Sequence, residues 1–525
     1  VKVYHESGKL GFSSPIFVAG GENDVKLVEL NINPEPTLPG YATKLTATVS
    51  NMGVWPVDNL EVAFYYDSVG EGNLIGSGTI TRLAAGARQE VEVTWQPAAA
   101  GQTRIYAVLT AIPGVTTVPE LSKAVKVVSS NNKKVLVDQG HGNSEVPDTH
   151  NELMELLRRY GYEASFNTQP ITADLLNGVD ELILNTPTDY SKNLTAAEMD
   201  AVAAWVKNGG SLMLAGKSNY QFEGTAGNSY HDGCTMLNPL LQKLGSGIRL
   251  NNDNVYEPNS STDYSGGMKW SVYARTIPAA PSGLNADLEA IRYFSGCSLA
   301  DENLQALTSD PTGGPEVLVA GNKTSYNFNV QPGYYTYNSA VGGENDPGQT
   351  AGPDGDKIPI IAKEDIGSGR LVVAGRYFYS DYEIVNDVSN TAFTLRLIDW
   401  LARNDHLRSI ANVRQNAKPG DIVTVQGVVT APTDNFFDVV YIQDATGGIS
   451  LYGTQGKELP VGTAVIATGG VQYFEGELEL AYENADMEVL YVGPGTSVQP
   501  TALSTCEVML PQYTGTLVRT GGTIT

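Results

Sequence analysis

Two kinds of hydrophobic pattern divide the chain. Between residues 25 and 128, apolar and polar positions alternate in at least four runs, at residues 45–49, 62–66, 91–95 and 105–109. Pro-Gly and Ala-Gly pairs, which favour turns, separate these runs. Alternation with period two places every second side chain on one face of a strand. Short alternating runs joined by turns therefore predict an antiparallel β-sandwich.

The motifs of this first segment follow those of a known family. The chain has NMG at residues 51–53, FYYD at 64–67, LAAG at 83–86 and VTW at 93–95. With this order of motifs, residues 25–130 resemble the CARDB family of bacterial Ig-like cell-surface domains. The resemblance implies an Ig-like sandwich that acts as a spacer or an adhesion module.

A different pattern begins at Lys133. Short apolar runs occur at residues 135–137, 182–184, 212–214 and 371–373, and amphipathic helical segments lie between several of them. Buried parallel strands that alternate with helices predict a doubly wound, flavodoxin-like parallel sheet.

This fold makes a prediction about position. The carboxyl ends of parallel strands meet at one edge of the sheet, where ligands bind. We therefore expect a parallel sheet of at least four strands, with Asp138, Lys217 and Arg376 at or just beyond the carboxyl ends of their strands.

The same region resembles a second family. The segments KKVLVDQGHGN, LLRRYGYEASF and LTAAEMDAVAAWVKNGGSLMLAG are similar to glutamine-amidotransferase-like domains of the DUF4350 and GldG type. The predicted domain covers residues 131–406, with an insertion at about 220–357. True amidotransferases carry a Cys on the tight turn after a strand. Here the run 212–214 leads to Ala-Gly-Lys-Ser at 215–218, so the amidotransferase reaction is not expected.

The third pattern begins near Arg408. The segments GDIVTVQGVVT, FFDVVYIQDATGGISLYG and VGTAVIATGGVQYFEGELEL resemble the OB-fold domain that accompanies secreted nucleases of the YhcR type. We expect this OB-fold barrel at residues 407–495. Residues 515–525 align with residues 420–430, so residues 496–525 are predicted to start a second OB-like repeat that the chain does not complete.

The two ends of the chain suggest further domains. The sequence opens on a strand-like run without an initiator Met and closes inside another strand-like run. Residues 1–24 are predicted to be a linker or the end of an upstream domain.

Composition narrows the choice of partners. The chain has 33 Lys and Arg against 58 Asp and Glu, which gives a formal net charge of -25. Such a charge repels phosphate backbones and anionic lipids, so nucleic acid is not an expected partner. No apolar run reaches about 18 residues, so no membrane span is predicted in this segment.

The loop after the first strand of the α/β region is the main candidate site. Asp138 and His141, with Asp148 and His150 nearby, could form an acid/base pair or ligate a metal, and Asn143 follows in the same loop. The alternative is that Asp138 and Asn143 cap the turn while His141 hydrogen-bonds the backbone. The candidate ligand-binding set is Asp138, His141, Asn143, Lys217, Ser218 and Arg376.

An acidic loop is a candidate calcium site. Glu344, Asp346, Asp354 and Asp356 supply the oxygen ligands that Ca²⁺ prefers, although the loop lacks the EF-hand register. The alternative is a solvated loop. No cofactor is required, and calcium is the one metal that the sequence suggests.

Cysteine usage leaves two readings open. Cys234 and Cys297 fall in one region and could pair if the protein is secreted, or they are two buried free thiols. The prediction is that they lie close enough to bridge.

Charge also decides the expectation for the OB-fold region. Residues 408–493 contain four Lys and Arg against eleven carboxylates. Affinity for a polyanion comes chiefly from cations that neutralise phosphates, so this domain is not expected to bind nucleic acid. Its aromatic residues are read as core, or as a contact for sugar or protein.

Together these observations favour a secreted bacterial cell-surface protein. We expect the segment to be a structural and binding array without catalytic residues, located outside the cell. Its expected partners are other surface proteins or polysaccharide, and self-association would fit modules with unpaired terminal strands. One alternative is a set of accessory modules of a larger metallohydrolase or nuclease. A second is a hydrolase or carbohydrate-acting α/β domain that uses the Asp138 to Asn143 loop.

Overall fold

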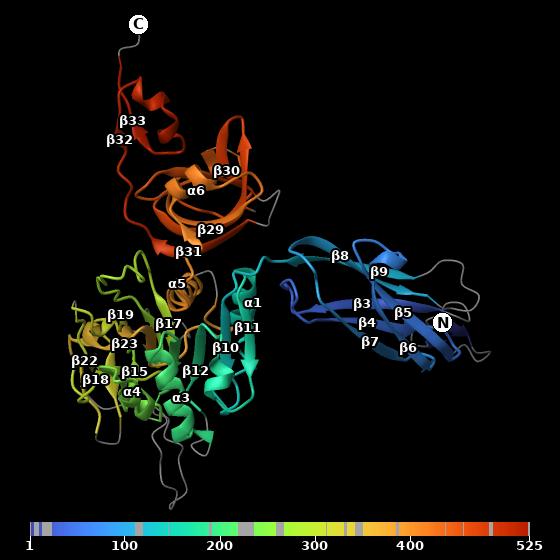
Figure 1. Ribbon diagram of the computed structural model, residues 1–525, viewed down its shortest axis with the longest axis horizontal. Helices are drawn as coiled ribbons and strands as arrows, with labels where there is room; N and C mark the ends of the chain where they lie inside the picture. Colours follow the sequence, from blue (N-terminus) through green and yellow to red (C-terminus); the bar gives the residue numbers. More distant parts are fainter. Residues whose placement is uncertain are drawn as a thin grey trace, which may run out of the picture. The chain divides into compact units, whose positions relative to one another are not determined.

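The protein forms two compact units (Figure 1). One unit comprises residues 1–132 with 157–163, and the other comprises residues 133–156 with 164–525. A computed structural model describes residues 2–4, 10–12, 24–110, 119–144, 146–187, 192–218, 236–258, 267–310, 312–329, 333–341, 350–384, 388–435, 437–454, 456–481 and 487–522. At the start of the chain, β1 (Lys2–Tyr4) and β2 (Leu10–Phe12) pair antiparallel.

The first unit contains a sandwich of two antiparallel sheets. One sheet has the order β3-β4-β7 and the other has the order β6-β5-β8-β9. The strands are β3 (Val25–Asn33), β4 (Thr43–Asn51), β5 (Val57–Tyr66), β6 (Leu74–Leu83), β7 (Arg88–Trp95), β8 (Gly101–Leu109) and β9 (Glu120–Val127), with the turn η1 (Glu71–Asn73) before β6.

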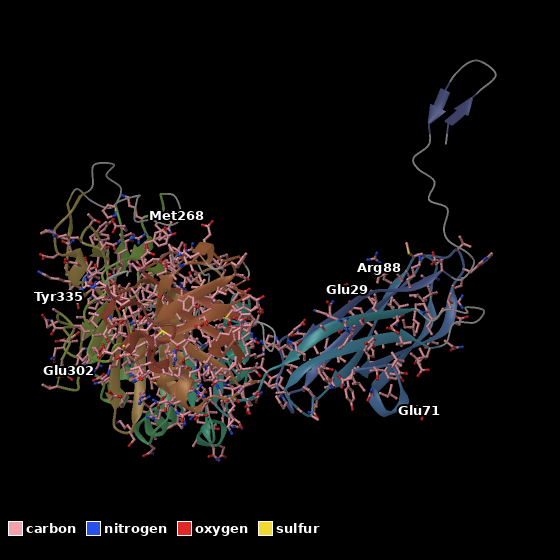
Figure 2. The ribbon with its side chains drawn as sticks, turned by 90° about the horizontal axis from the view of Figure 1, so that it is seen from above. Glu29, Glu71, Arg88, Met268, Glu302 and Tyr335 are labelled. Atoms are coloured by element: carbon pink, nitrogen blue, oxygen red, sulfur yellow. The ribbon has the colours of Figure 1, made fainter. Side chains whose placement is uncertain are left out.

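The sandwich follows from the alternation along its strands. The inward residues of both sheets, among them Leu45, Val62 and Ile105, are fully buried in one cluster. Outward residues such as Glu29 and Arg88 are exposed (Figure 2). The predicted antiparallel β-sandwich is confirmed.

The second unit is built around a seven-stranded sheet. Its order is β11-β10-β12-β13-β24-β23-β19. The strands are β10 (Lys134–Asp138), β11 (Glu163–Asn167), β12 (Glu181–Asn185), β13 (Ser211–Ala215), β19 (Glu316–Ala320), β23 (Pro359–Ile366) and β24 (Gly369–Ala374). The pairs β10–β12, β12–β13 and β13–β24 are parallel, whereas β23 and β19 add to the sheet antiparallel. The prediction of at least four parallel strands is confirmed.

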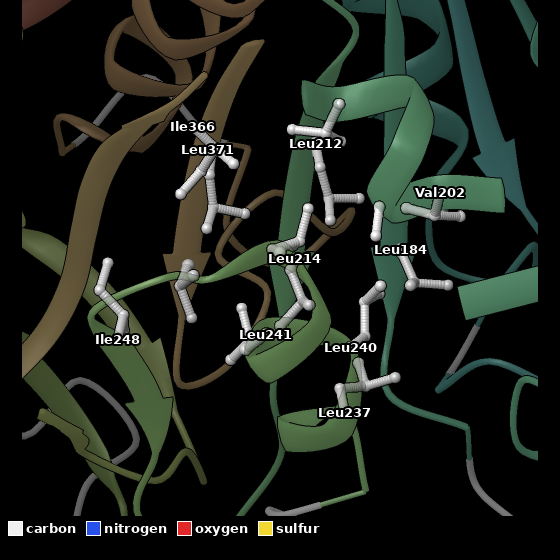
Figure 3. Packing of buried hydrophobic residues seen from close by; sticks show 14 of the residues in the cluster. Leu184, Val202, Leu212, Leu214, Leu237, Leu240, Leu241, Ile248, Ile366 and Leu371 are labelled. Atoms are coloured by element: carbon white, nitrogen blue, oxygen red, sulfur yellow. The ribbon is translucent and has the colours of Figure 1, made fainter. Parts of the chain in front are cut away.

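Helices cover both faces of this sheet. The helices are α1 (Asn151–Arg159), α2 (Ala173–Leu176), α3 (Ala196–Lys207), α4 (Asn238–Leu244) and α5 (Asn390–Ala402). Leu184, Leu212 and Leu214 pack with residues of α2, α3 and α4 in one buried cluster (Figure 3). Ser211 at the start of β13 donates through its hydroxyl to the Leu401 carbonyl of α5, which lies on the opposite face.

The described part of the predicted insertion contains α4, β19, several short strands and buried polar groups. The short strands are β14 (Ile248–Leu250), β15 (Asn254–Tyr256), β16 (Ser271–Ala274), β17 (Ile291–Phe294), β18 (Leu299–Asp301), β20 (Tyr326–Phe328), β21 (Ala340–Val341) and β22 (Thr350–Ala351), followed by η5 (Gly355–Lys357). Asp253 is fully buried and accepts hydrogen bonds from Asn251, Ser298 and Asn327. Because α4 and β19 belong to the main core and sheet, the insertion is part of this domain rather than a separate one.

The C-terminal part of this unit is a closed barrel. Strands β26 (Ile422–Ala431), β27 (Val439–Gln443), β28 (Gly448–Tyr452), β29 (Thr463–Phe474) and β30 (Glu477–Ala481) form it, with β31 (Glu488–Pro494) added at one edge. The barrel closes because β26 pairs with both β27 and β29. The remaining elements are β25 (Leu407–Arg408), α6 (Ile410–Asn416), η6 (Thr433–Asn435), β32 (Thr501–Ala502), η7 (Glu507–Met509), η8 (Pro511–Tyr513) and β33 (Val518–Arg519).

The described helices are too short or too polar to cross a membrane.

Candidate functional site

The carboxyl edge of the parallel sheet holds the predicted site residues. Asp138 is the last residue of β10, Lys217 follows β13 by two residues, and Arg376 follows β24 by two residues. The predicted positions of all three are confirmed. The next two strand ends carry polar residues as well, since Asn167 ends β11 and Asn185 ends β12.

His141 is held between two carboxylates. Its Nδ1 lies 2.7 Å from Asp138 Oδ2, and its Nε2 lies 3.1 Å from Glu198 Oε1. All three side chains are buried, and Asp138 is fully so. Carboxylate oxygens accept hydrogen bonds, so this arrangement favours the imidazolium form of the ring, in which both nitrogens donate.

Electrostatics agree with this geometry. The hydrogen bond with Asp138 raises the pKa of His141 above its usual value, against burial, and the charge of Glu198 acts in the same direction. Burial works to raise the pKa of Glu198, but hydrogen bonds from Thr195 and Ile171 and the charge of His141 lower it overall. Both shifts favour a protonated His141 beside an ionised Glu198 in the triad of Asp138, His141 and Glu198.

Both carboxylates of the triad have further donors. Asn167 Nδ2 donates to Asp138 Oδ1 at 3.1 Å. The backbone N–H of Thr195 and of Ile171 donate to Glu198 at 2.8 Å and 3.1 Å. Glu198 also completes a capping box with Thr195 at the start of α3. The triad thus fastens the loop after β10 to the first turn of α3.

The backbone of this loop leaves little space for a side chain at position 142. Gly142 has a φ of 57°, and a Cβ at this position would lie 2.7 Å from the Lys192 side chain. Asn143 Oδ1 accepts from the His141 N–H, and Asn143 Nδ2 donates to the Asn185 carbonyl at 2.9 Å. The prediction that Asn143 caps the turn describes its contacts correctly. The prediction that His141 bonds to the backbone does not, because its ring bonds to carboxylates.

A second chain of buried polar groups was not predicted from the sequence. Tyr379 donates through its hydroxyl to Asn185 Oδ1 at 2.8 Å, and Asn185 Nδ2 lies 3.1 Å from His150 Nε2. The His150 ring packs edge-on against the rings of Tyr377 and Tyr379. Asn185 ends β12, whereas His150 and Tyr379 lie in loops, and no spacing in the sequence links the three residues.

The other predicted ligand residues lie with different partners. Ser218 is buried, and its Oγ is 2.9 Å from Ser295 Oγ of the insertion. The Arg376 guanidinium stacks on the Tyr377 ring, 4.0 Å from its centroid. Cys297 is buried, forms no disulfide with a described residue, and its Sγ lies 3.4 Å from the Gly375 carbonyl oxygen. Its predicted partner Cys234 lies outside the described residues, so the bridge stays a prediction.

The structure describes only two of the four residues of the predicted calcium site. Glu344 and Asp346 lie outside the described residues, and Asp354 forms an ion pair with Lys357. Asp356 lies in η5. Within the described ranges, no group of three or more His, Cys, Asp or Glu side chains is arranged to hold a metal ion.

The hydrogen-bonding groups of His141 and Asp138 are all paired within the protein. A general base needs a ring nitrogen or a carboxylate oxygen that can reach a substrate proton. Here both nitrogens of His141 and both oxygens of Asp138 have protein partners. Among the described residues, Asp138 and His141 are therefore engaged in holding this loop.

Comparison with known proteins identifies the first domain. Residues 23–120 match the CARDB family, so this part of the chain is a CARDB domain, as the motifs predicted. Domains of this family are found in cell-surface proteins. No curated protein matches the chain.

Solved structures give distant similarities. A structure named mmIFT52 N-terminal domain is 17% identical with a TM-score of 0.37, and the match covers 52% of this chain and 98% of that one. The CARDB domain of a Pyrococcus furiosus protein, solved in complex with di-metal ions, is 20% identical with a TM-score of 0.18. That match covers 21% of this chain and 93% of that one.

Proposed function

We propose that the chain is a structural and binding segment of a secreted, multidomain cell-surface protein. The observation that carries this proposal is the loop at the carboxyl edge of the α/β sheet, where His141 is enclosed by Asp138 and Glu198. An enzyme of this fold class would keep reactive groups open at that edge. The CARDB domain supports an extracellular or cell-surface location, since such domains occur in cell-surface proteins.

The α/β domain is proposed to be flavodoxin-like and related to the amidotransferase-like domains of the DUF4350 and GldG type. If β10, β11, β12, β13 and β24 are counted in chain order, the sheet has the order 2-1-3-4-5, which is the flavodoxin-like order. The turn after β13 carries Gly216, Lys217 and Ser218 where an amidotransferase needs its Cys. The domain therefore uses the fold without that reaction.

The barrel is proposed to be an OB fold of the YhcR type. Its strand order closes through β26 and β29, and β28 pairs parallel with β30. A barrel of five strands is the architecture of this fold. With four cations against eleven carboxylates in residues 408–493, the barrel is suited to an uncharged ligand or to protein rather than to nucleic acid.

The segment after the barrel is proposed to start a second OB-like repeat. In the barrel, Leu407 of β25 pairs parallel with Thr424 of β26, 17 positions later. In the C-terminal segment, Thr501 of β32 pairs parallel with Val518 of β33, again 17 positions later. A helical turn lies between the two strands in both cases. The shared register supports a repeated unit and a protein built from serial modules.

Two measurements test the proposed function. Antibodies raised against residues 25–130 should label intact cells of the producing organism, and external protease should remove the signal. The purified chain should show no hydrolase activity on esters, phosphodiesters or glycosides above that of a His141→Leu variant. Labelling only after lysis would contradict the location, and activity that disappears in the variant would favour the hydrolase alternative.

A further inference from the structure

A cavity of about 630 Å³ lies where the barrel meets the α/β domain. Ligand sites in proteins are commonly about 300 to 1,000 Å³ and often lie at domain interfaces. The wall is formed by β25, by the middle of β26, by the end of β27 and the residues after it, by the segment 496–499 and by Asp287 of the α/β domain. No feature of this cavity takes part in the network at the carboxyl edge of the sheet.

The cavity arises from an interruption in strand pairing. On one side of β26, β25 pairs with residues up to Val425, and β27 pairs with residues from Val428 onward. Gln426 and Gly427 lie between these two partners and line the cavity. The site is therefore built into a strand of the barrel, which is a rigid element.

Two polar side chains in the cavity have no protein partner. Arg408 and Gln426 line it, and their side chains form no hydrogen bond or ion pair with any residue that the structure describes. Asp287 lines it too, accepting from Thr496 Oγ1 at 3.4 Å, and it does not pair with Arg408. A guanidinium can only donate and a carboxylate can only accept. The cavity thus offers a donor and an acceptor that are not satisfied by each other.

The conformation of Asp287 is imposed by its neighbours. Its φ is 59°, a left-handed value that is uncommon for residues other than glycine. The preceding Ala286 carbonyl accepts from the buried Arg396 at 2.6 Å. A Cβ on Gly493 would lie 2.2 Å from the Asp287 carbonyl oxygen, so the barrel packs directly on this residue. Strained residues held in this way are often found where a protein contacts a ligand.

We propose that this cavity binds a neutral saccharide through vicinal hydroxyl groups, with Arg408 and Asp287 as the main polar contacts. Hydroxyl groups both donate and accept, so a pair of them satisfies the guanidinium and the carboxylate together. Leu407, Val428 and Val498 supply apolar surface for the C–H face of a sugar ring. The net charge of -25 opposes a polyanion but has no effect on an uncharged glycan.

The inference rests on the proposed binding role, for which it names the class of ligand. Its test is titration calorimetry of the full chain with neutral oligosaccharides of glucose, mannose, galactose and N-acetylglucosamine. At least one series should bind saturably, with an affinity that changes little between about 50 and 500 mM salt. The Arg408→Gln and Asp287→Asn variants should each bind about 10- to 100-fold more weakly.

Matched controls keep the test independent of folding. Asn tolerates the left-handed conformation at position 287, and Arg408 is exposed, so both variants should melt at the wild-type temperature. Lys418→Gln removes an exposed cation of the same domain that does not line the cavity, and it should bind like wild type.

Absence of binding across the panel, or binding that survives both substitutions, would overturn the inference. So would binding restricted to acidic glycans or peptides. None of these results would alter the surface-labelling outcome, so the two proposals fail separately.

Discussion

Replacing His141 with Leu should destabilise the α/β domain strongly. The substitution removes the cation that lies between Asp138 and Glu198, both of which are buried. Glu198 keeps its N–H donors from Thr195 and Ile171, whereas Asp138 keeps only the Asn167 amide among its described side-chain contacts. The loss should therefore fall mainly on Asp138, which becomes a buried charge with too few partners.

The magnitude follows from the burial of this pair. Removing one partner of a buried ion pair costs about 3 to 5 kcal/mol. For a domain of this size, each kcal/mol lowers the melting temperature by about 2 °C, so the expected decrease is roughly 6 to 10 °C. A second substitution, Asp138→Asn, should recover part of the loss in the His141→Leu background, because it removes the uncompensated charge.

The loss of stability in the His141→Leu variant should become smaller as the pH rises. The pKa of His141 is raised in the folded state above its usual 6.5. Its stabilisation is therefore complete below about pH 6.5 and is lost as the pH rises through the folded-state pKa. The difference in melting temperature between wild type and His141→Leu should be largest near pH 6 and should shrink at alkaline pH.

Calorimetry of the full chain from pH 5.5 to 10 measures this difference. Hydrogen exchange followed by mass spectrometry should show faster exchange in residues 134–144 and 195–199 of the variant, with the CARDB domain unchanged as internal control. A decrease below about 2 °C, or a difference that grows with pH, would refute the ion-triad reasoning.

Three further results are expected. Glu181→Gln should raise the melting temperature at pH 7, because the Glu181 carboxyl is fully buried without a hydrogen-bond partner among the described residues and burial raises its pKa well above the usual value. Calorimetry should show this gain shrinking as the pH falls toward 4.5, and no gain at pH 7 would contradict it. Residues 406–495 should form no saturable complex with single-stranded DNA at low salt in an anisotropy assay, and tight binding that weakens with salt would refute this. Gly493→Ala should lower the melting temperature and speed exchange around Asp287, because a Cβ there would lie 2.2 Å from the Asp287 carbonyl oxygen. An unchanged exchange rate would show that the contact between residue 493 and Asp287 accommodates a methyl group.

The fold could be predicted from the sequence where one local pattern determines an element. Buried parallel strands are apolar along their whole length, so the runs at 135–137, 182–184, 212–214 and 371–373 marked β10, β12, β13 and β24. The end of the first of these runs predicts the position of Asp138 and of the loop that follows it. In the CARDB domain, strict alternation gave the sandwich because each sheet buries one face.

The partners within the site were not predictable in the same way. Glu198 is 57 positions from His141, and only the packing of α3 beside the loop brings them together. The Thr-x-x-Glu capping box at 195–198 was a readable signal for the start of α3, but it gave no indication that Glu198 also faces a histidine. His150 and Tyr379 reach Asn185 at the end of β12 from two loops whose paths depend on the whole sheet.

The position of the proposed saccharide cavity follows from how α5 divides its contacts. Its buried Arg396 donates to the Leu284 and Ala286 carbonyls, and Ser389 at its N-terminus donates to the Val492 carbonyl of β31 while accepting from the Glu289 N–H. One helix thus fixes the segment 284–290 on one side and the barrel on the other. The Ser211 hydroxyl of the central strand β13 also donates to the Leu401 carbonyl of α5. The region between the segment 284–290 and the barrel is therefore held by the sheet and is rigid. A polar ligand is bound most tightly by groups that need no reorganisation. The polar groups of the His141 loop are paired within the protein, whereas the cavity presents Arg408 and Gln426, whose side chains have no partner among the described residues, and this difference favours the cavity as a binding region of this unit.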